Sequence, residues 1–225
     1  MSRKPWLLRG LITVTVAVAI ALTSQLGMAQ SPSRVLFENV RIFDGTSLAG
    51  VKCVEHGHLI DEETAQLMAE QGTWLSIQPI LDDEYAIFPE GSPEPQRGKF
   101  VQVTDGTDNA YNLAKQYGLK VAFGTDMLFD PGLAVRQGAQ LAKLVRWYEP
   151  WEVLKMATST NAELFAMSGP RNPYPGTLGV VEEGALADLL LVDGNPLENI
   201  ELIEDPEDNF VVIMKDGVIY KDLVS

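Results

Sequence analysis

The chain has two histidines, and they lie two residues apart. His56 and His58 stand in the segment VKCVEHGHLIDEE, between a short apolar run and an acidic helix start. Imidazole nitrogens are common zinc ligands, and two residues at this spacing in a strand point to the same face. The pair therefore raises the question of a metal site, and of where its other ligands would lie.

A carboxylate that could share such a site follows another apolar run. Asp126 comes after LKVAFGT, in which Gly124 ends the predicted strand. A carboxylate beside a metal-bound water can accept the proton of that water as it attacks a carbonyl group. Asp126 could instead be a turn residue whose side chain binds nearby backbone N–H groups.

The neighbours of His56 also have simpler interpretations. Glu55 could orient His56 or be a solvated acid, and His58 is expected to be a polar residue that caps the loop. Cys53 is the single cysteine, so it cannot form an internal disulfide. Its apolar surroundings predict a buried small side chain rather than a reactive thiol.

Strands and helices are predicted to alternate in the middle of the chain. KCVEHG, TWLSIQPI and LKVAFGTDM have the pattern of short strands. A helix follows the first strand, with Asp61 as its N-cap and Gly72 just past its end. This alternation is typical of parallel βαβ units, whose functional groups lie at the carboxyl ends of the strands.

The other helices are placed by their end signals and apolar spacing. Residues 81–99 are rich in proline and glycine and are predicted to form a long loop, followed by a second helix over 107–118. A third helix is expected to carry Ala134 and Leu141 on one face, and Pro150 is suited to the first turn of a fourth. Thr158 and Asn161 are expected to brace that last helix, and the core is expected to contain Trp74, Trp147 and Trp151.

The two ends of the chain have a different residue pattern, with short apolar runs separated by turn residues. RVLFENVRIFDGT reads as a hairpin near the start, and KDG separates two apolar runs near the end. We therefore expect residues 30–50 and 170–225 to form one composite β-sandwich domain. Residues 51–169 would form the βα domain between them.

The first 29 residues have the pattern of a secretory signal peptide. Arg3, Lys4 and Arg9 precede an apolar run, and small residues lead to Ala29. This predicts a secreted or periplasmic protein. A membrane would be involved only if the leader were not cleaved.

Composition limits the remaining function classes. The 225 residues are 46% hydrophobic, which is enough for a buried core, and the formal net charge is −14. A phosphate backbone would be repelled by this charge, so nucleic acid is not expected as a partner.

Several motifs together resemble the amidohydrolase superfamily, in the branch of imidazolonepropionase-like and Xaa-Pro dipeptidase-like enzymes. They are NVRIFDGT, VEHGHLIDEETAQLMAEQGTW, YNLAKQYGLKVAFGTDM, TLGVVEEGALADLLLVDGNPLENI and VVIMKDGVIY. The resemblance implies an α/β protein with a TIM-like (β/α) barrel and a small β-sandwich. It also implies metal-dependent hydrolysis of a carbon–nitrogen bond in a small-molecule amide or dipeptide.

The resemblance assigns roles to two residues. His56 would end the sixth barrel strand and bind Zn²⁺ or another divalent metal. Asp126 would end the eighth strand, where it would touch the metal and act as the catalytic base. These positions would bring one imidazole and one carboxylate to the same end of the barrel.

The family's other ligands have no counterpart in this sequence. They are a His-x-His pair on the first strand, a carboxylated lysine or acid on the fourth, and a histidine on the fifth. HGH could itself be the first-strand pair, but its flanks match the sixth unit better. The segment 51–168 is also less than half of the ~250 residues of a complete barrel.

The sequence therefore predicts a partial barrel of about strands six to eight, with impaired hydrolase activity. The alternative is an inactive, truncated remnant that serves at most as an exported binding or scaffold protein. An open barrel edge would expose unpaired backbone groups, so a homo-oligomer through that edge is expected in either case.

Overall fold

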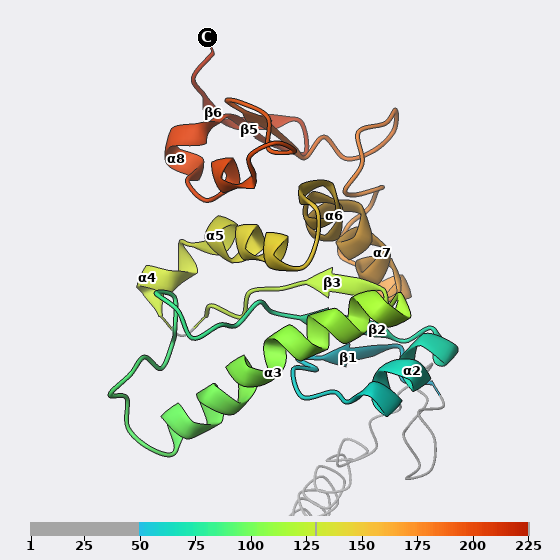
Figure 1. Ribbon diagram of the computed structural model, residues 1–225. Coiled ribbons are helices and arrows are strands. Elements are labelled where there is room, and N and C mark those ends of the chain that lie inside the picture. Colours follow the sequence, from blue (N-terminus) through green and yellow to red (C-terminus); the bar gives the residue numbers. More distant parts are fainter. Residues whose placement is uncertain (1–49, 129, 225) are drawn as a thin grey trace, which may run out of the picture. The chain divides into compact units, whose positions relative to one another are not determined.

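The computed structural model describes residues 50–128 and 130–224 (Figure 1). The predicted leader over 1–29 and the predicted hairpin that follows it lie outside the described residues. In the described part, no helix is both long and apolar enough to cross a membrane.

The middle of the chain forms a three-stranded parallel sheet. Its strands are β1 (Cys53–Glu55), β2 (Trp74–Ile77) and β3 (Val121–Phe123), in the order β1-β2-β3. Cys53 pairs with Trp74, and Leu75 pairs with Val121. All three strands lie inside the predicted segments, so the expected α/β architecture is confirmed.

The first connection is helix α2 (Glu62–Gln71), and both of its ends are as predicted. The Asp61 carboxylate accepts a hydrogen bond from Thr64 N at 2.8 Å. Gly72 adopts the left-handed conformation at φ 63°, which lets the chain turn directly into β2.

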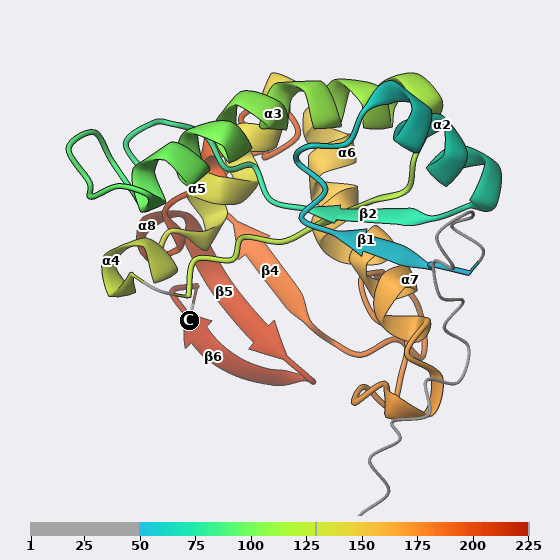
Figure 2. The same cartoon turned by 90° about the horizontal axis from the view of Figure 1, so that it is seen from below.

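The second connection is helix α3 (Gln96–Tyr117), which lies across the sheet in Figures 1 and 2. The prediction of a loop to residue 99 and a helix from 107 was wrong, because the helix starts at Gln96. Gly98 and Gly106, which are unfavourable inside a helix, obscured the helical pattern. The buried stripe nevertheless continues from Phe100 through Thr104 and Thr107, where threonine takes apolar positions.

Several short helices follow β3. They are α4 (Pro131–Ala134), α5 (Gln137–Ala142), the 3₁₀ turn η1 (Lys143–Arg146), α6 (Pro150–Lys155), the π-helical segment η2 (Met156–Thr160), α7 (Asn161–Ala166) and the 3₁₀ turn η3 (Gly169–Arg171). Pro150 opens α6 as predicted, and Glu149 with Glu152 forms a capping box there. The predicted third helix is divided between α4, α5 and η1.

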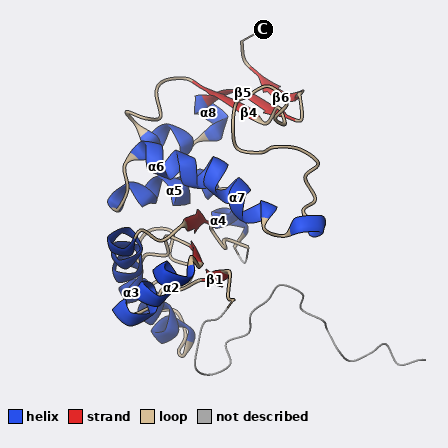
Figure 3. Cartoon of the chain, turned by 90° about the vertical axis from the view of Figure 1, so that its right-hand side faces the viewer, coloured by secondary structure: helices blue, strands red, loops and turns tan. Residues whose placement is uncertain are grey.

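The C-terminal residues form a separate antiparallel sheet, shown in red in Figure 3. It contains β4 (Leu189–Val192), β5 (Phe210–Lys215) and β6 (Val218–Asp222), with η4 (Ile200–Ile203) and α8 (Pro206–Asn209) between β4 and β5. The predicted KDG turn joins β5 to β6, with Asp216 and Gly217 at φ 49° and 75°. The composite domain with residues 30–50 stays a prediction.

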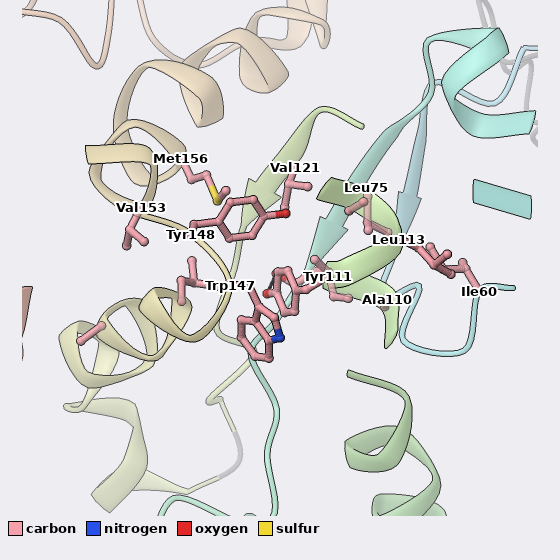
Figure 4. Close-up of a cluster of buried hydrophobic side chains, with 14 of the residues drawn as sticks. Ile60, Leu75, Ala110, Tyr111, Leu113, Val121, Trp147, Tyr148, Val153 and Met156 are labelled. Atoms are coloured by element: carbon pink, nitrogen blue, oxygen red, sulfur yellow. Dashed lines mark hydrogen bonds between the residues drawn. The ribbon is translucent and has the colours of Figure 1, made fainter. Parts of the chain in front are cut away.

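The centre of the core is an aromatic stack. Tyr111 of α3 lies against Trp147 with ring centroids 4.2 Å apart, and Tyr148 meets Tyr111 edge-on (Figure 4). Trp74 and Trp147 are buried as predicted. The prediction for Trp151 was wrong, because its side chain on α6 is 57% exposed.

Candidate active site

The structure brings His56 and Asp126 together at the carboxyl ends of the parallel strands. His56 Nδ1 lies 3.9 Å from Asp126 Oδ2, and both side chains are open to solvent at 59% and 37% exposure. His56 directly follows β1, whereas Asp126 lies beyond the end of β3. The carboxyl ends of barrel strands are where the active sites of such folds are built.

Both residues have an unusual backbone conformation. His56 has φ 67° and Asp126 has φ 55°, in the left-handed region that residues with a Cβ seldom adopt. Such strain is found most often at functional sites, where the surrounding structure holds it in place. Here the two residues with this conformation are the ones whose side chains approach each other.

His58 is placed differently from His56. It is 5% exposed, and its Nε2 lies 3.0 Å from the carbonyl oxygen of Gln78. Since a carbonyl only accepts, Nε2 carries the proton in this contact. Burial lowers the pKa of His58, so the ring is neutral at neutral pH. His58 thus ties the loop after β1 to the loop after β2.

Glu55 and Cys53 interact with each other. The Cys53 thiol lies 3.2 Å from Glu55 Oε1, and no hydrogen bond joins Glu55 to His56 among the described residues. Burial raises the pKa of Cys53 to about 12, and Glu55 adds to the effect. The raised pKa favours the protonated form of the thiol, and the side chain is half-buried rather than buried as predicted.

Helix α3 supports the loops that follow β1 and β2. Asn109 Nδ2 donates to Ile60 O at 3.2 Å, and Thr107 Oγ1 donates to Ile80 O at 2.7 Å. Gly106 lets the helix approach the first loop, because a Cβ there would lie 2.4 Å from His58 O. The helix therefore fixes the loop backbone that carries both histidines.

The loop after β2 is fastened at its base by two ion pairs. Arg97 holds Asp82 through two hydrogen bonds of 2.6 and 2.8 Å, and Lys143 Nζ lies 2.6 Å from Asp83 Oδ2. The Lys143 side chain is only 12% exposed, so this pair is partly shielded from solvent. These contacts hold the loop beside Asp126.

Two buried glutamines near the site are not predicted by the sequence. Gln78 is 6% exposed and Gln140 is 0% exposed. Gln78 Oε1 and both polar atoms of the Gln140 amide have no hydrogen-bond partner in the described part of the chain. The only signal in the sequence is a polar residue next to apolar ones, in SIQPI and in GAQLA.

The described residues bring together two side chains of types that can bind a metal, but not a complete set of ligands. Across residues 50–128 and 130–224, no group of three or more His, Cys, Asp and Glu side chains could hold a metal ion. A catalytic zinc usually has three protein ligands and one open position. His56 and Asp126 fit two of those places by chemistry, and the donor set is incomplete without a further ligand.

Comparison with models of protein families identifies the family of this chain. The model of the amidohydrolase family matches residues 44–224, which is most of the chain. This chain belongs to the amidohydrolase family. The resemblance carried by the sequence motifs is therefore confirmed.

Individual relatives agree with this assignment. Ochratoxinase from Aspergillus niger is 32% identical over 174 residues. Among solved structures, an amidohydrolase superposes with a TM-score of 0.67 at 32% identity, covering 78% of this chain and 41% of its own. A prolidase in complex with N-methylphosphonate-L-proline gives 0.65 at 30% identity, with 77% and 41% covered.

These matches cover only part of the relatives. The alignment with ochratoxinase takes in 77% of this chain but 34% of that protein. The parallel sheet with its helices and the antiparallel sheet thus correspond to a portion of an amidohydrolase TIM-barrel protein, as the predicted partial barrel requires.

Proposed function

We propose that this chain carries part of the active site of a metal-dependent hydrolase acting on a carbon–nitrogen bond. The observation that carries the proposal is the 3.9 Å approach of His56 Nδ1 to Asp126 Oδ2 across the strand ends. Family membership supports hydrolysis. The left-handed backbone conformation of His56 and Asp126 supports a role in which both residues are held in fixed positions.

His56 and Asp126 would take part in holding a divalent metal such as zinc, with the missing ligands supplied from outside the described residues. When bound, the metal would lower the pKa of a water and polarise the carbonyl under attack. The Asp126 carboxylate would take up the proton of the attacking water and deliver it to the leaving nitrogen. The solvent exposure of Asp126 leaves room for this transfer.

We propose a small amide or a dipeptide as the substrate. The prolidase neighbour holds a proline phosphonate, which supports compounds in which an acyl group is joined to the nitrogen of proline. Ochratoxinase is named for a different substrate, so the two relatives give two kinds of probe. An N-acyl-L-proline and ochratoxin should both be assayed.

The alternative is an inactive member that serves as an exported binding or scaffold protein. The lack of a third ligand among the described residues favours it. Metal analysis of purified protein separates the two functions. A working site predicts about one zinc per active chain, which is lost in His56→Ala and in Asp126→Asn.

Asp105→Asn is the matched control, because Asp105 is exposed on α3 and lies outside the site. It should keep the metal content of the unchanged chain. Zinc at the same level in all four proteins, or zinc in none, would reject the proposed metal site and leave the scaffold function.

We also propose that the outer edge of β1 is a contact surface between copies of this chain. Val54 pairs with β2, so in this parallel ladder the amides of Cys53 and Glu55 face outward. Light scattering should show a dimer or larger species. Cys53→Pro removes one outward amide and should shift the population to monomer, whereas a monomer in both proteins would reject this interface.

Export by residues 1–29 is the remaining proposal, supported by the signal-peptide pattern of the sequence. Expression of the full chain in a bacterial host, followed by mass spectrometry of the periplasmic fraction, tests it. A mature chain that starts just after Ala29 is the expected result. An intact N-terminus in the membrane fraction would show an anchor instead.

A further inference from the structure

Asp126 also lines a small cavity. It has a volume of about 30 Å³, and its polar wall residues are Tyr85, Thr125, Asp126, Gln140 and Lys143. The rest of the wall is apolar and comes mainly from the loop after β2 and from α3. We call this space the Gln140 cavity. Asp126 therefore lines this cavity in addition to approaching His56.

The polar wall groups differ in whether they already have partners. Lys143 is paired with Asp83, and Tyr85 accepts a hydrogen bond from Arg136. The Thr125 hydroxyl donates to Gln137 Oε1. Gln140 is the exception, because its fully buried amide has neither an acceptor nor a donor among the described residues.

A buried amide without hydrogen-bond partners destabilises a protein, because its polar groups lose their contacts with water and gain none in exchange, so the Gln140 amide points to a ligand. The ligand must donate to Gln140 Oε1 or accept from Gln140 Nε2. An apolar group could do neither. A cation could satisfy only the oxygen, and the ammonium group of Lys143 on the same wall opposes it.

Water meets each requirement. A cavity needs roughly 10–15 Å³ to hold one water, and buried waters typically make about three hydrogen bonds to polar groups that would otherwise be unsatisfied. The Gln140 cavity has enough room for one water, and Gln140, Thr125 and Asp126 are among the residues that line it.

We propose that the Gln140 cavity holds an ordered water that links the Gln140 amide to the Asp126 carboxylate. This makes Gln140 a positioning residue, because the water fixes one carboxylate oxygen on the cavity side while the other faces His56. The inference that a water binds here depends only on the cavity and the residues that line it. Its value for catalysis rests on the proposed function.

The first test uses the unchanged chain and needs no activity. In protein treated with a chelator, nuclear Overhauser measurements should show cross-peaks between the Gln140 side-chain amide protons and a long-lived water. The absence of such cross-peaks from an assigned Gln140 amide would overturn the proposal.

The second test compares Gln140→Met, which keeps the side-chain length and removes the polar atoms, with Gln102→Met on the exposed face of α3. The water bridge predicts that Gln140→Met lowers the folding equilibrium constant roughly five- to tenfold and moves the Asp126 carboxyl ¹³C shift at constant pH 7. Gln102→Met should do neither.

An amide without any ligand predicts the opposite result for Gln140→Met. Stability should then rise, because an unsatisfied polar group is removed, and the Asp126 signal should stay in place. That outcome would overturn the proposal. Since neither readout depends on hydrolysis or on bound metal, failure of this proposal is distinguishable from failure of the proposed function.

Discussion

Asn161 and Phe123 exchange two hydrogen bonds. Phe123 N donates to Asn161 Oδ1 at 3.0 Å, and Asn161 Nδ2 donates to Phe123 O at 2.9 Å. The side-chain amide thus takes the place of a neighbouring strand at the last residue of β3. It connects α7 to the strand that leads to Asp126, which gives the predicted bracing role of Asn161 a definite partner.

Replacement of Asn161 should therefore destabilise the protein. Asn161→Asp keeps the acceptor and loses the donor, so Phe123 O loses its partner and a charge is added. We expect the free energy of unfolding to fall by about 1–3 kcal/mol in a urea titration. Asn172→Asp is the control, because Asn172 is half-buried and its Oδ1, which aspartate keeps, only accepts a hydrogen bond from Tyr174 N. An equal loss in both variants would contradict the role given to Asn161.

Gly106 and Gly98 provide a matched pair on α3. Gly106→Ala would place a Cβ 2.4 Å from the backbone oxygen of His58, and we expect a loss of about 1–3 kcal/mol in unfolding free energy. The His58 amide signal should move in the same variant, because the loop must shift.

Gly98→Ala puts its Cβ near the flexible end of the Glu94 side chain, at 2.9 Å. Glu94 can move aside, and alanine is about 1 kcal/mol better than glycine inside a helix. The expected change is therefore neutral or stabilising. Similar destabilisation by the two substitutions would show that helix contact with the His58 loop is not the cause.

The two tryptophans on either side of Pro150 should behave differently. Trp147 is buried against Tyr111, so Trp147→Ala should lower the unfolding free energy by about 3–5 kcal/mol. Trp151 is 57% exposed, so Trp151→Ala should change it by no more than about 0.5 kcal/mol. Chemical denaturation monitored by circular dichroism compares them, and a large loss for Trp151→Ala would contradict its exposed position.

Asp108 should contribute stability that depends on pH. Arg146 lowers its pKa through two hydrogen bonds, and Trp147 Nε1 donates a third at 2.9 Å. A lowered folded-state pKa stabilises the protein above the unfolded pKa of about 3.9 and loses that effect as pH falls through the folded pKa.

The stability difference between the unchanged chain and Asp108→Asn should therefore be full at pH 7 and shrink below about pH 4. Denaturation at a series of pH values measures it. Asp105→Asn on the same helix is the control, and it should show a smaller difference, because Asp105 is exposed and lacks the hydrogen bonds that Asp108 receives from Arg146 and Trp147. A constant difference for Asp108→Asn down to pH 2 would reject the coupling to Arg146.

Much of the fold could be predicted because its signals are local. Asp61 and Gly72 mark the ends of α2 through short-range capping, and apolar runs mark the three parallel strands. Helix α3 was predicted too short, because the buried stripe of its first half uses Thr104, whose burial is set by tertiary packing and not by its residue type. The hydroxyl of Thr107 is satisfied by Ile80 O, which is far away in sequence.

For the site, the sequence by itself determined the family, the residue types at the strand ends and the two residues proposed for chemistry. Only the tertiary structure decided that His56 meets Asp126, that His58 instead bonds the Gln78 carbonyl, and that Gln140 is buried without a partner. The physical reason is that strand and cap signals act within a few residues. Distances, burial and hydrogen-bond satisfaction are set by segments that meet only after the chain has folded.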